Sequence, residues 1–303
     1  MKKIISLISS IVLAAGMTTA LAANAEEEKK IEIDYKPSFY FKAEEGTGVE
    51  VLKYGTVFVN KTVAGEGAKV SASVYFKDDD KCAGQVFAKW NCDNPDLQLT
   101  DLTGPFTKAG NCPFKITGIN SDADLVNTMD TFPDLNMLII NYMDTNVMRP
   151  MQLAGSASDD YPLAYFSAKF KDGAAGGSYD IKMYDDGKTF RTNVAPRFVD
   201  DLSISVDIFP AEDSESLRVN ASDRKLGDIN NDGKIDAVDA SGILAAYAKI
   251  SSNKDPEMTA DQMAAADVDG NRKVDAVDAS NVLGYYAYIS GSGSGTLNEF
   301  VKK

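Results

Sequence analysis

The sequence predicts two domains: a mostly β N-terminal domain, folded as an antiparallel jelly-roll-like β-sandwich, and a small α-helical C-terminal domain. Short segments rich in β-branched and aromatic residues, bounded by Gly, Pro, Asn or Asp, recur through residues 34–210. This pattern is typical of antiparallel sandwiches. After residue 225, an acidic unit followed by a short apolar helix pattern occurs twice, beginning at Asp228 and again at Asp267. Such internal repeats indicate a duplicated structural unit.

Several segments of the N-terminal domain have the composition of strands. They are residues 56–60, 69–76, 85–90, 136–142, 163–170, 179–184 and 202–209. We expect residues 122–132 to form a short helix or a loop insertion. Aspartates cluster at predicted turns, as at Asp78–Asp80 and Asp185–Asp186. Solvated turn formers are far more common at such places than the acid–base pair of a glycosidase, so we predict no catalytic residue.

The composition limits the classes of function. The chain has 303 residues, 44% of them hydrophobic, a net charge of −14 and no histidine. The acidity argues against nucleic acid and anionic membranes as partners. The lack of histidine excludes Ser-His-Asp and Cys-His catalysis and His-ligated zinc. Carboxylate chemistry and oxygen-ligated metals are left.

Residues 1–25 have the pattern of a secretory signal peptide. Lys2 and Lys3 precede an apolar run that is too short to span a membrane, and Ala23-Asn24-Ala25 offers a cleavage site. We therefore expect a secreted, extracellular protein. The polar residues 211–224 predict a linker, and the Gly/Ser-rich start of residues 291–303 predicts a flexible tail. The folded domains are then 34–210 and 225–290.

The chain has three cysteines, Cys82, Cys92 and Cys112. An odd count in a secreted protein allows one disulfide and leaves one thiol. One structural bridge and three buried thiols are both compatible with the sequence, and the pairing stays open.

Each repeat opens with a 12-residue stretch that offers oxygen ligands at positions 1, 3, 5, 7, 9 and 12, the spacing of an EF-hand-like calcium loop. Oxygen ligands without Cys or His favour calcium over zinc or copper. We therefore expect two Ca²⁺ ions, one in each loop. The predicted ligands are Asp228, Asn230, Asp232, Lys234 (through its carbonyl), Asp236 and Asp239 in the first loop, and Asp267, Asp269, Asn271, Lys273 (through its carbonyl), Asp275 and Asp278 in the second.

The two loops depart from the usual calcium loop in two ways. Position 12 is Asp rather than Glu in both, so the backbone must approach the ion more closely. Position 6 is Gly233 in the first loop and Arg272 in the second. The sharp turn at this position favours glycine. We therefore expect a strained backbone or a shifted turn at Arg272, and a second site of equal or weaker affinity.

An apolar stripe follows each loop. Its members are Ile243, Leu244, Tyr247 and Ile250 in the first repeat, and Val282, Leu283, Tyr286 and Ile289 in the second. Two helices of this kind share only a small core, so we expect the metal to stabilise the domain and chelation to unfold it.

A duplicated calcium loop that ends in Asp and is followed by a single helix resembles a dockerin, the calcium-dependent plug module of cellulosomes. The resemblance covers about residues 226–289 and departs from the dockerin pattern at Arg272. An ordinary EF-hand pair would have a helix before each loop, and residues 222–227 have no helical pattern.

In dockerins, the partner, a cohesin, is recognised by loop positions 10 and 11 and by the following helix. The resemblance implies two near-equivalent binding surfaces related by a two-fold rotation, and hence a dual binding mode. The alternative is that these Ala and Val residues only pack on the calcium loop. The implied contacts are Ala237, Val238, Leu244, Ala245 and Lys249 on the first repeat, and Ala276, Val277, Leu283, Gly284 and Tyr288 on the second.

The N-terminal domain resembles a cohesin in its strand pattern. Residues 57–76 and 84–102 are similar to the opening strands, and residues 136–184 to the closing half with its Gly-rich turn. A cohesin joined to a dockerin implies a non-catalytic adaptor scaffoldin of an extracellular cellulosome, in polysaccharide degradation. Its dockerin would bind a cohesin of a scaffoldin, and its cohesin would receive a dockerin-bearing protein.

Two other classes stay open for the N-terminal domain. The first is a dockerin-borne carbohydrate-binding module. Sugar platforms use exposed aromatic side chains, and the sequence has one tryptophan, Trp90, although tyrosines can substitute. The second is a small dockerin-borne glycoside hydrolase or esterase, which the modest size and the lack of histidine disfavour.

Overall fold

The structure is a computed structural model, and it describes residues 36–77, 83–104, 114–116, 125–144, 151–153, 162–184, 192–196, 209–210 and 214–303. These residues belong to one compact unit, Lys36–Lys303. Some predictions fall outside the described residues, namely the signal peptide, Asp78–Asp80, Asp185–Asp186, Cys82 and Cys112.

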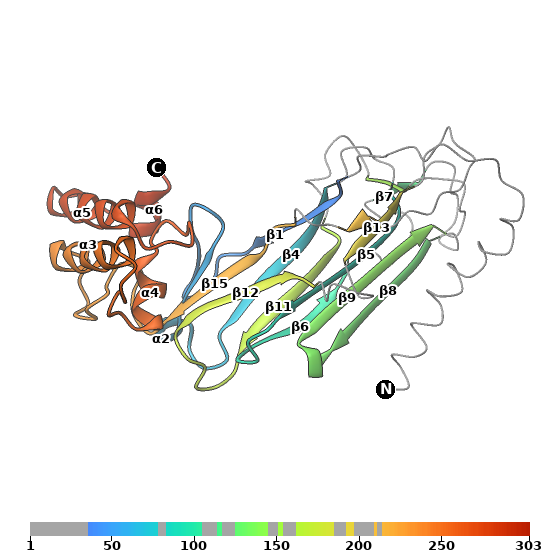
Figure 1. Cartoon of the computed structure of the whole chain (residues 1–303), viewed down its shortest axis with the longest axis horizontal. Coiled ribbons are helices and arrows are strands. Elements are labelled where there is room, and N and C mark those ends of the chain that lie inside the picture. Colours follow the sequence, from blue (N-terminus) through green and yellow to red (C-terminus); the bar gives the residue numbers. More distant parts are fainter. Residues whose placement is uncertain are drawn as a thin grey trace, which may run out of the picture. The chain divides into compact units, whose positions relative to one another are not determined.

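One sheet of the N-terminal domain has four antiparallel strands in the order β1-β4-β11-β6 (Figure 1). Successive side chains of a strand point to opposite faces, and in β4 alternate residues from Val70 to Phe76 are buried. The strands are β1 (Ser38–Ala43), β4 (Lys69–Lys77), β11 (Ala164–Phe170) and β6 (Leu97–Thr103).

The other large sheet follows the order β14-β13-β5-β12-β15-β3-β2, and the hairpin of β8 and β9 joins it along β5. All its pairs are antiparallel except β15 with β3, which run parallel. The strands are β2 (Val49–Val51), β3 (Val57–Asn60), β5 (Ala83–Cys92), β8 (Leu125–Phe132), β9 (Met137–Asp144), β12 (Gly177–Met183), β13 (Asn193–Pro196), β14 (Phe209–Pro210) and β15 (Leu217–Ser222). The smaller elements are α2 (Lys61–Ala64), η3 (Pro133–Leu135) and the pair of β7 (Phe114–Ile116) with β10 (Met151–Leu153).

The two sheets enclose one core, which confirms the predicted sandwich. Trp90 of β5 is fully buried, and its ring centroid lies 5.7 Å from that of Phe166 of β11. Tyr142 of β9 is also buried, and its hydroxyl donates to the carbonyl of Leu163 at 2.8 Å. Cys92 is a free, buried thiol whose pKa is raised by burial, so a structural role fits it better than a reactive one.

Three segments differ from the predictions. The predicted linker contains β15, which is paired with β12 and β3 and buries Leu217, Val219 and Ala221. Residues 125–132 form the strand β8 instead of a helix or loop. The tail predicted to be flexible forms the helix α6 (Leu297–Val301), whose Leu297 and Val301 are buried. Both β15 and α6 have mostly polar sequences, but their few apolar side chains are spaced so that they are buried in the core.

The C-terminal domain is helical, as predicted. Besides α6 it contains α3 (Ala237–Ser251), α4 (Ala260–Ala266) and α5 (Ala276–Ser290). Each of these four helices begins with a capping box, which satisfies backbone N–H groups of its first turn. Among the described residues, no helix is long and apolar enough to cross a membrane.

Candidate calcium loops and partner surface

The first loop is closed by two buried carboxylates, at its first and last positions. Asp228 accepts hydrogen bonds from the N–H groups of Asp232 (3.1 Å) and Gly233 (2.9 Å). Asp239 accepts from the N–H groups of Ile229 and Asp236, both at 3.0 Å. The loop therefore folds around these carboxylates, as a calcium loop requires.

The second loop repeats most of this geometry, although one donor to its first carboxylate is at position 4 rather than position 5. Asp267 accepts from the N–H groups of Gly270 (3.1 Å) and Arg272 (3.2 Å). Asp278 accepts from the N–H groups of Val268 and Asp275, both at 2.9 Å. The repetition predicted from the sequence is thus also a repetition of hydrogen bonds, complete at Asp239 and Asp278 and partial at Asp228 and Asp267.

The remaining predicted ligands line the same loops. Asp236 and Asp275 are the N-caps of α3 and α5 and accept from the N–H groups of Val238 and Val277, each at 2.7 Å. Each side chain at positions 3 and 5 accepts from the N–H two residues further on, which gives the loop its tight turns. These side chains are Asn230, Asp232, Asp269 and Asn271. Asp232 accepts from the N–H of Lys234, and Asn271 accepts from the N–H of Lys273.

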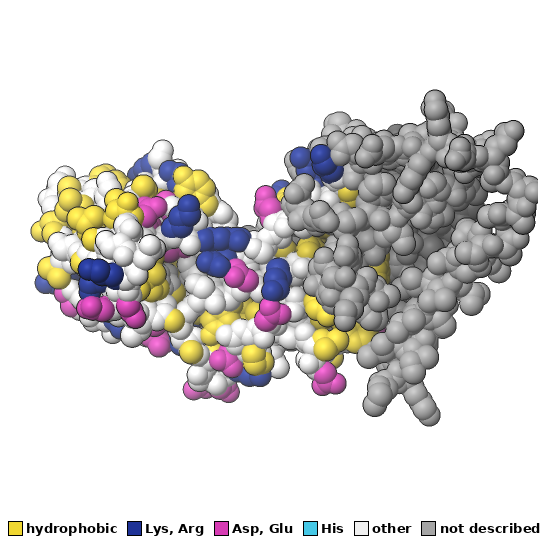
Figure 2. Space-filling view, viewed as in Figure 1, with side chains coloured by type: hydrophobic (Ala, Val, Ile, Leu, Met, Phe, Trp, Pro, Cys, Tyr) yellow, Lys and Arg dark blue, Asp and Glu magenta, His cyan; other side chains and the backbone are white. Residues whose placement is uncertain are grey.

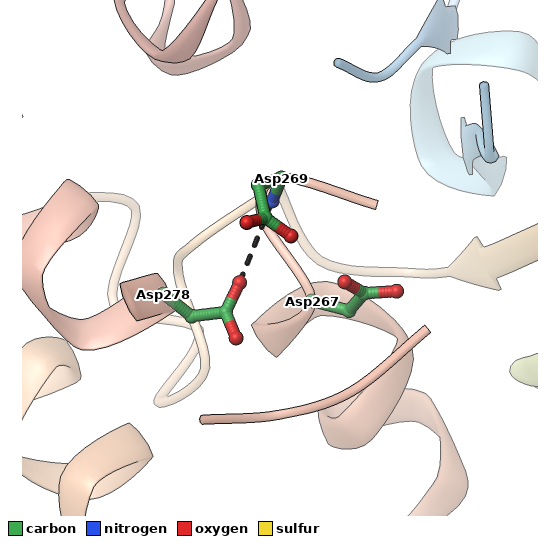
Figure 3. A group of neighbouring side chains, drawn as sticks. All are labelled: Asp267, Asp269 and Asp278. Atoms are coloured by element: carbon green, nitrogen blue, oxygen red, sulfur yellow. Dashed lines mark hydrogen bonds between the residues drawn. The ribbon is translucent and has the colours of Figure 1, made fainter. Parts of the chain in front are cut away.

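Three carboxylates of the second loop form a buried acidic cluster. The ligand oxygens of Asp267, Asp269 and Asp278 lie within 4.8 Å of one another. Figure 3 shows Asp278, at the start of α5, beside the loop segment that carries Asp267 and Asp269. Burial is the main cause that raises the pKa of Asp267 to about 6 and that of Asp278 to about 8, and neighbouring aspartates add to both shifts.

This cluster fits a divalent cation. Burial also raises the pKa values of Asp269 and, in the first loop, of Asp239. Buried carboxylates that repel one another need a counter-charge to stay ionised, and a donor set of oxygens alone suits Ca²⁺. The aspartates would hold the ion, which would supply the charge that the loop lacks.

Both loops contain two residues in the left-handed region, at positions 4 and 6. The φ angles are 61° at Asn231 and 86° at Gly233 in the first loop, and 79° at Gly270 and 70° at Arg272 in the second. The strained backbone predicted at Arg272 is confirmed, since a positive φ is costly for a residue with a side chain. The glycine is therefore at position 6 in the first loop and at position 4 in the second.

Packing explains why the glycine of the second loop is at position 4. A Cβ on Gly270 would lie 2.7 Å from Cβ of Leu52 and 3.0 Å from Cβ of Thr56. The Thr56 hydroxyl donates to the Gly270 carbonyl at 2.7 Å, and the Tyr54 N–H donates to the Asp269 carbonyl at 3.2 Å. The second loop therefore lies against the β2–β3 turn of the sandwich, a contact that nothing in the sequence predicts.

More polar contacts bind the helical domain to the sandwich. The Arg272 guanidinium donates to the hydroxyl and the carbonyl of Ser216. The Asp261 carboxylate, on α4, accepts from the Ser222 hydroxyl (2.9 Å) and from Nε of Arg224 (2.8 Å). The segment predicted as a linker is therefore fixed at both of its described ends.

The helical domain also has a larger core than two helices provide. Ile243 of α3 and Val282 of α5 are fully buried in a cluster that includes Leu52 and Phe58 of the sandwich. The apolar stripe predicted on each helix is only partly buried, because Leu244 and Leu283 are half exposed. The domain therefore carries more apolar side chains than its core accommodates.

The predicted partner residues lie on the surface. Val238 is 62% exposed, Leu244 51%, Val277 52% and Leu283 50%. Figure 2 shows hydrophobic side chains on the face of the helical domain that is in view. Ala237, Ala245 and Ala276 are exposed too, whereas Lys249 and Gly284 are half-buried. Large exposed apolar side chains gathered on one domain are typical of an interaction site.

Residues 226–285 match the family model of the dockerin type I domain. This segment is therefore similar to type I dockerin domains, and the helical domain that contains it is called the dockerin domain below. Type I dockerins bind calcium, which agrees with the donor set of the two loops. The observed short helix before the second loop, α4, has no counterpart before the first, so the dockerin domain differs from an ordinary EF-hand pair.

No curated protein matches the chain. Similar solved structures include the seventh ScaB type I cohesin of Pseudobacteroides cellulosolvens, with 14% identity over 62% of this chain and 92% of that chain and a TM-score of 0.37. A type II cohesin domain from the cellulosome of Acetivibrio cellulolyticus has 15% identity over 61% and 95%, with a TM-score of 0.33. The Coh-OlpA-Doc918 complex of Clostridium thermocellum has 9% identity over 61% and 99%, with a TM-score of 0.36.

Proposed function

We propose that this chain is a non-catalytic adaptor of an extracellular cellulosome. Its dockerin domain, loaded with two Ca²⁺ ions, binds a cohesin of a scaffoldin. Its β-sandwich acts as a cohesin and receives another dockerin-bearing protein for polysaccharide degradation. The observation that supports the proposal most strongly is a set of exposed apolar side chains at the ends of the two loops and along α3 and α5. They are Val238, Leu244, Val277 and Leu283.

The calcium loops and the surface are mechanically connected. Asp239 and Asp278 close their loops and are also the third residues of α3 and α5. An ion held by these carboxylates would fix the start of each helix, where Ala237, Val238, Ala276 and Val277 lie. Binding of the partner should therefore depend on calcium, because a surface that is ordered beforehand loses less entropy on association.

The sandwich offers no support for a tryptophan-based sugar platform. Trp90 lies in the core between the sheets, so it cannot stack on a polysaccharide. One observation does favour carbohydrate binding as the second candidate. Tyr40 and Tyr75 are stacked across β1 and β4 with ring centroids 5.1 Å apart, and the exposed Tyr165 lies on the neighbouring strand β11.

A retention experiment with the full chain tests the proposal. Immobilised scaffoldin cohesins should retain the chain in calcium and release it in EGTA. Val238→Asp combined with Val277→Asp should abolish retention. Val63→Asp, at a similarly exposed valine of α2, is the matched control and should bind normally. Retention that is indifferent to both calcium and the double substitution would refute the dockerin role.

The sandwich needs its own assay, again with the full chain. A panel of dockerin proteins and insoluble cellulose and xylan are offered to the Val238→Asp, Val277→Asp variant, whose own dockerin surface is blocked. Capture of a dockerin supports the adaptor. Retention on polysaccharide without any dockerin captured, and lost on Tyr75→Ala, would establish the carbohydrate-binding alternative.

A further inference from the structure

The two candidate partner surfaces of the dockerin domain are not equivalent, because helix α6 contacts only one of them. We call them the α3 surface and the α5 surface. The α3 surface consists of Ala237, Val238, Leu244, Ala245 and Lys249. The α5 surface consists of Ala276, Val277, Leu283, Gly284 and Tyr288.

Phe300 of α6 lies over the C-terminal half of the α5 surface. A Cβ built on Gly284 would lie 3.3 Å from Cζ of Phe300, so the ring rests on the helix backbone. The Phe300 ring centroid is 5.5 Å from that of Tyr288 and 5.9 Å from that of Tyr285. The Nζ atom of Lys303 lies 5.2 Å from the centroid of the Tyr288 ring. Figure 1 shows α6 beside α5.

Several contacts hold α6 in this place. Leu297 and Val301 are buried in the core of the dockerin domain. The Asn298 side chain donates to the Val51 carbonyl and Lys53 donates to the Val301 carbonyl, both at 3.1 Å. The helix is therefore fixed by the core of its own domain and by the β2–β3 region of the sandwich, so displacing it would break contacts to both.

The α3 surface carries no such cover within the described residues. Its counterpart of Gly284 is Ala245, which is exposed, and its counterpart of Tyr288 is Lys249, which pairs with Glu257 at 2.5 Å. A partner that lies flat on α3 therefore meets a small alanine. The same partner rotated onto α5 would meet the ring of Phe300 at the corresponding point.

We propose that α6 closes the α5 surface, so that the dockerin domain accepts its partner in one orientation, through the α3 surface. This inference rests on the proposed cohesin-binding function and revises the dual mode implied by the resemblance. Ala276, Val277 and Leu283 stay exposed, but a rigid partner that needs the whole helix face cannot reach them without displacing Phe300. The obstruction is steric and local to one ring.

The test measures affinity for one scaffoldin cohesin with the native chain and four full-length, calcium-loaded variants: Val238→Asp and Val277→Asp, each with and without Phe300→Ala. With Phe300 present, Val238→Asp should weaken binding on the order of 100-fold, the effect of losing a central interface residue. Val277→Asp should change it less than about threefold, within the range of contacts that carry little binding energy. In the Phe300→Ala background, Val238→Asp should regain most of the lost affinity, because the second orientation becomes open.

Two other binding results would decide against the proposal. Equal losses from Val238→Asp and Val277→Asp with Phe300 present would mean that both surfaces are used. A Val238→Asp defect that Phe300→Ala does not relieve would mean that α6 is not the obstruction. If Phe300→Ala fails to fold, Phe300→Leu keeps an apolar group at the core and removes the ring from Tyr288. A native chain that binds no cohesin would refute the proposed function itself, and the one-orientation proposal with it.

Discussion

Nδ2 of Asn220 lies 3.1 Å from Oδ2 of Asp267 and donates a hydrogen bond to it. Asn220 belongs to the last strand of the sandwich, and Asp267 is the first ligand position of the second calcium loop. The Asn220 amide is itself oriented, because its Oδ1 accepts from the Ser178 hydroxyl at 2.7 Å. One domain therefore positions a predicted metal-ligating carboxylate of the other, whereas in the first loop the two bonds that hold Asp228 come from loop N–H groups.

The first prediction is that Asn220→Ala weakens the second calcium site and leaves the first one unchanged. Groups that orient metal ligands typically contribute 10–100-fold to metal affinity, so we expect the affinity of the second loop to fall by about tenfold. Calorimetric titration of the metal-free chain with Ca²⁺ should resolve two binding steps, and the substitution should change the affinity of only one of them.

Ser178→Ala is the matched control for this prediction. It removes the hydrogen bond that orients the Asn220 amide and leaves the bond donor to Asp267 in place, so its effect should be clearly smaller. An equal loss at both calcium sites on Asn220→Ala would contradict the assignment, since that result indicates general destabilisation.

The second prediction compares two glycines of the loops, both at positive φ. Ala at Gly233 meets nothing within 4 Å, so Gly233→Ala carries only the cost of a left-handed residue, about 1–2 kcal/mol. Gly270→Ala carries the same cost and also a clash with Leu52 and Thr56. We expect Gly270→Ala to lower the melting temperature at least twice as much as Gly233→Ala, measured by calorimetry in saturating calcium.

The interface with the sandwich gives this comparison a second readout. The Gly270→Ala clash should separate the loop from the β2–β3 turn, and hydrogen exchange should then increase at Tyr54, whose N–H bonds to Asp269. Gly233→Ala should leave that amide protected. Equal melting temperatures for the two variants would show that the close approach at Gly270 has no energetic weight.

Features that repeat or alternate in the sequence were predictable, and features that depend on tertiary contacts were not. The ligand spacing of the loops predicted their geometry, because each carboxylate bonds to nearby N–H groups of its own loop. Strand β15 was missed because Arg218, Asn220 and Ser222 make it polar, and these positions acquire partners only in the folded chain. The sequence also does not explain why residue 270 is a glycine, because the reason is the close approach of Leu52 and Thr56 in the folded chain.

The third prediction concerns removal of calcium. Excess EGTA should melt α3 and α5, because the buried aspartates of each loop then repel one another without a counter-charge. Ligand present at a thousand times its Kd contributes about 4 kcal/mol to stability, a large share of what a domain of this size has. The magnitude of the helical far-UV dichroism signal should decrease in EGTA and recover when calcium is added.

Hydrogen exchange locates this transition. Amides of α3 and α5 should lose protection in EGTA while those of β4 and β5, in the core of the sandwich, retain it. Phe58 and Leu52 share a core with the dockerin domain, so exchange in β3 should increase to an intermediate extent. Unchanged dichroism in excess EGTA would contradict a structural role of the metal.

The fourth prediction is a pH dependence of the metal-free chain. Burial raises the pKa of Asp267 to about 6 and that of Asp278 to about 8, above the value of about 4 that an unfolded aspartate has. Between these values the folded state binds more protons than the unfolded state, so the free energy of unfolding must decrease as the pH rises. The stabilisation is complete below pH of about 4 and is lost as the pH passes through the folded pKa values. In EGTA the dockerin domain should therefore have its highest melting temperature near pH 4 and should lose its helices as the pH rises towards 8, which is where the EGTA experiment above expects it to be unfolded. Saturating calcium should reverse the trend because the ion binds the ionised carboxylates. Asp278→Asn is the control, since it removes the group with the higher pKa and should flatten the decrease above pH 6. A metal-free chain that became more stable with rising pH would show that these carboxylates are already ionised and neutralised by groups of the protein.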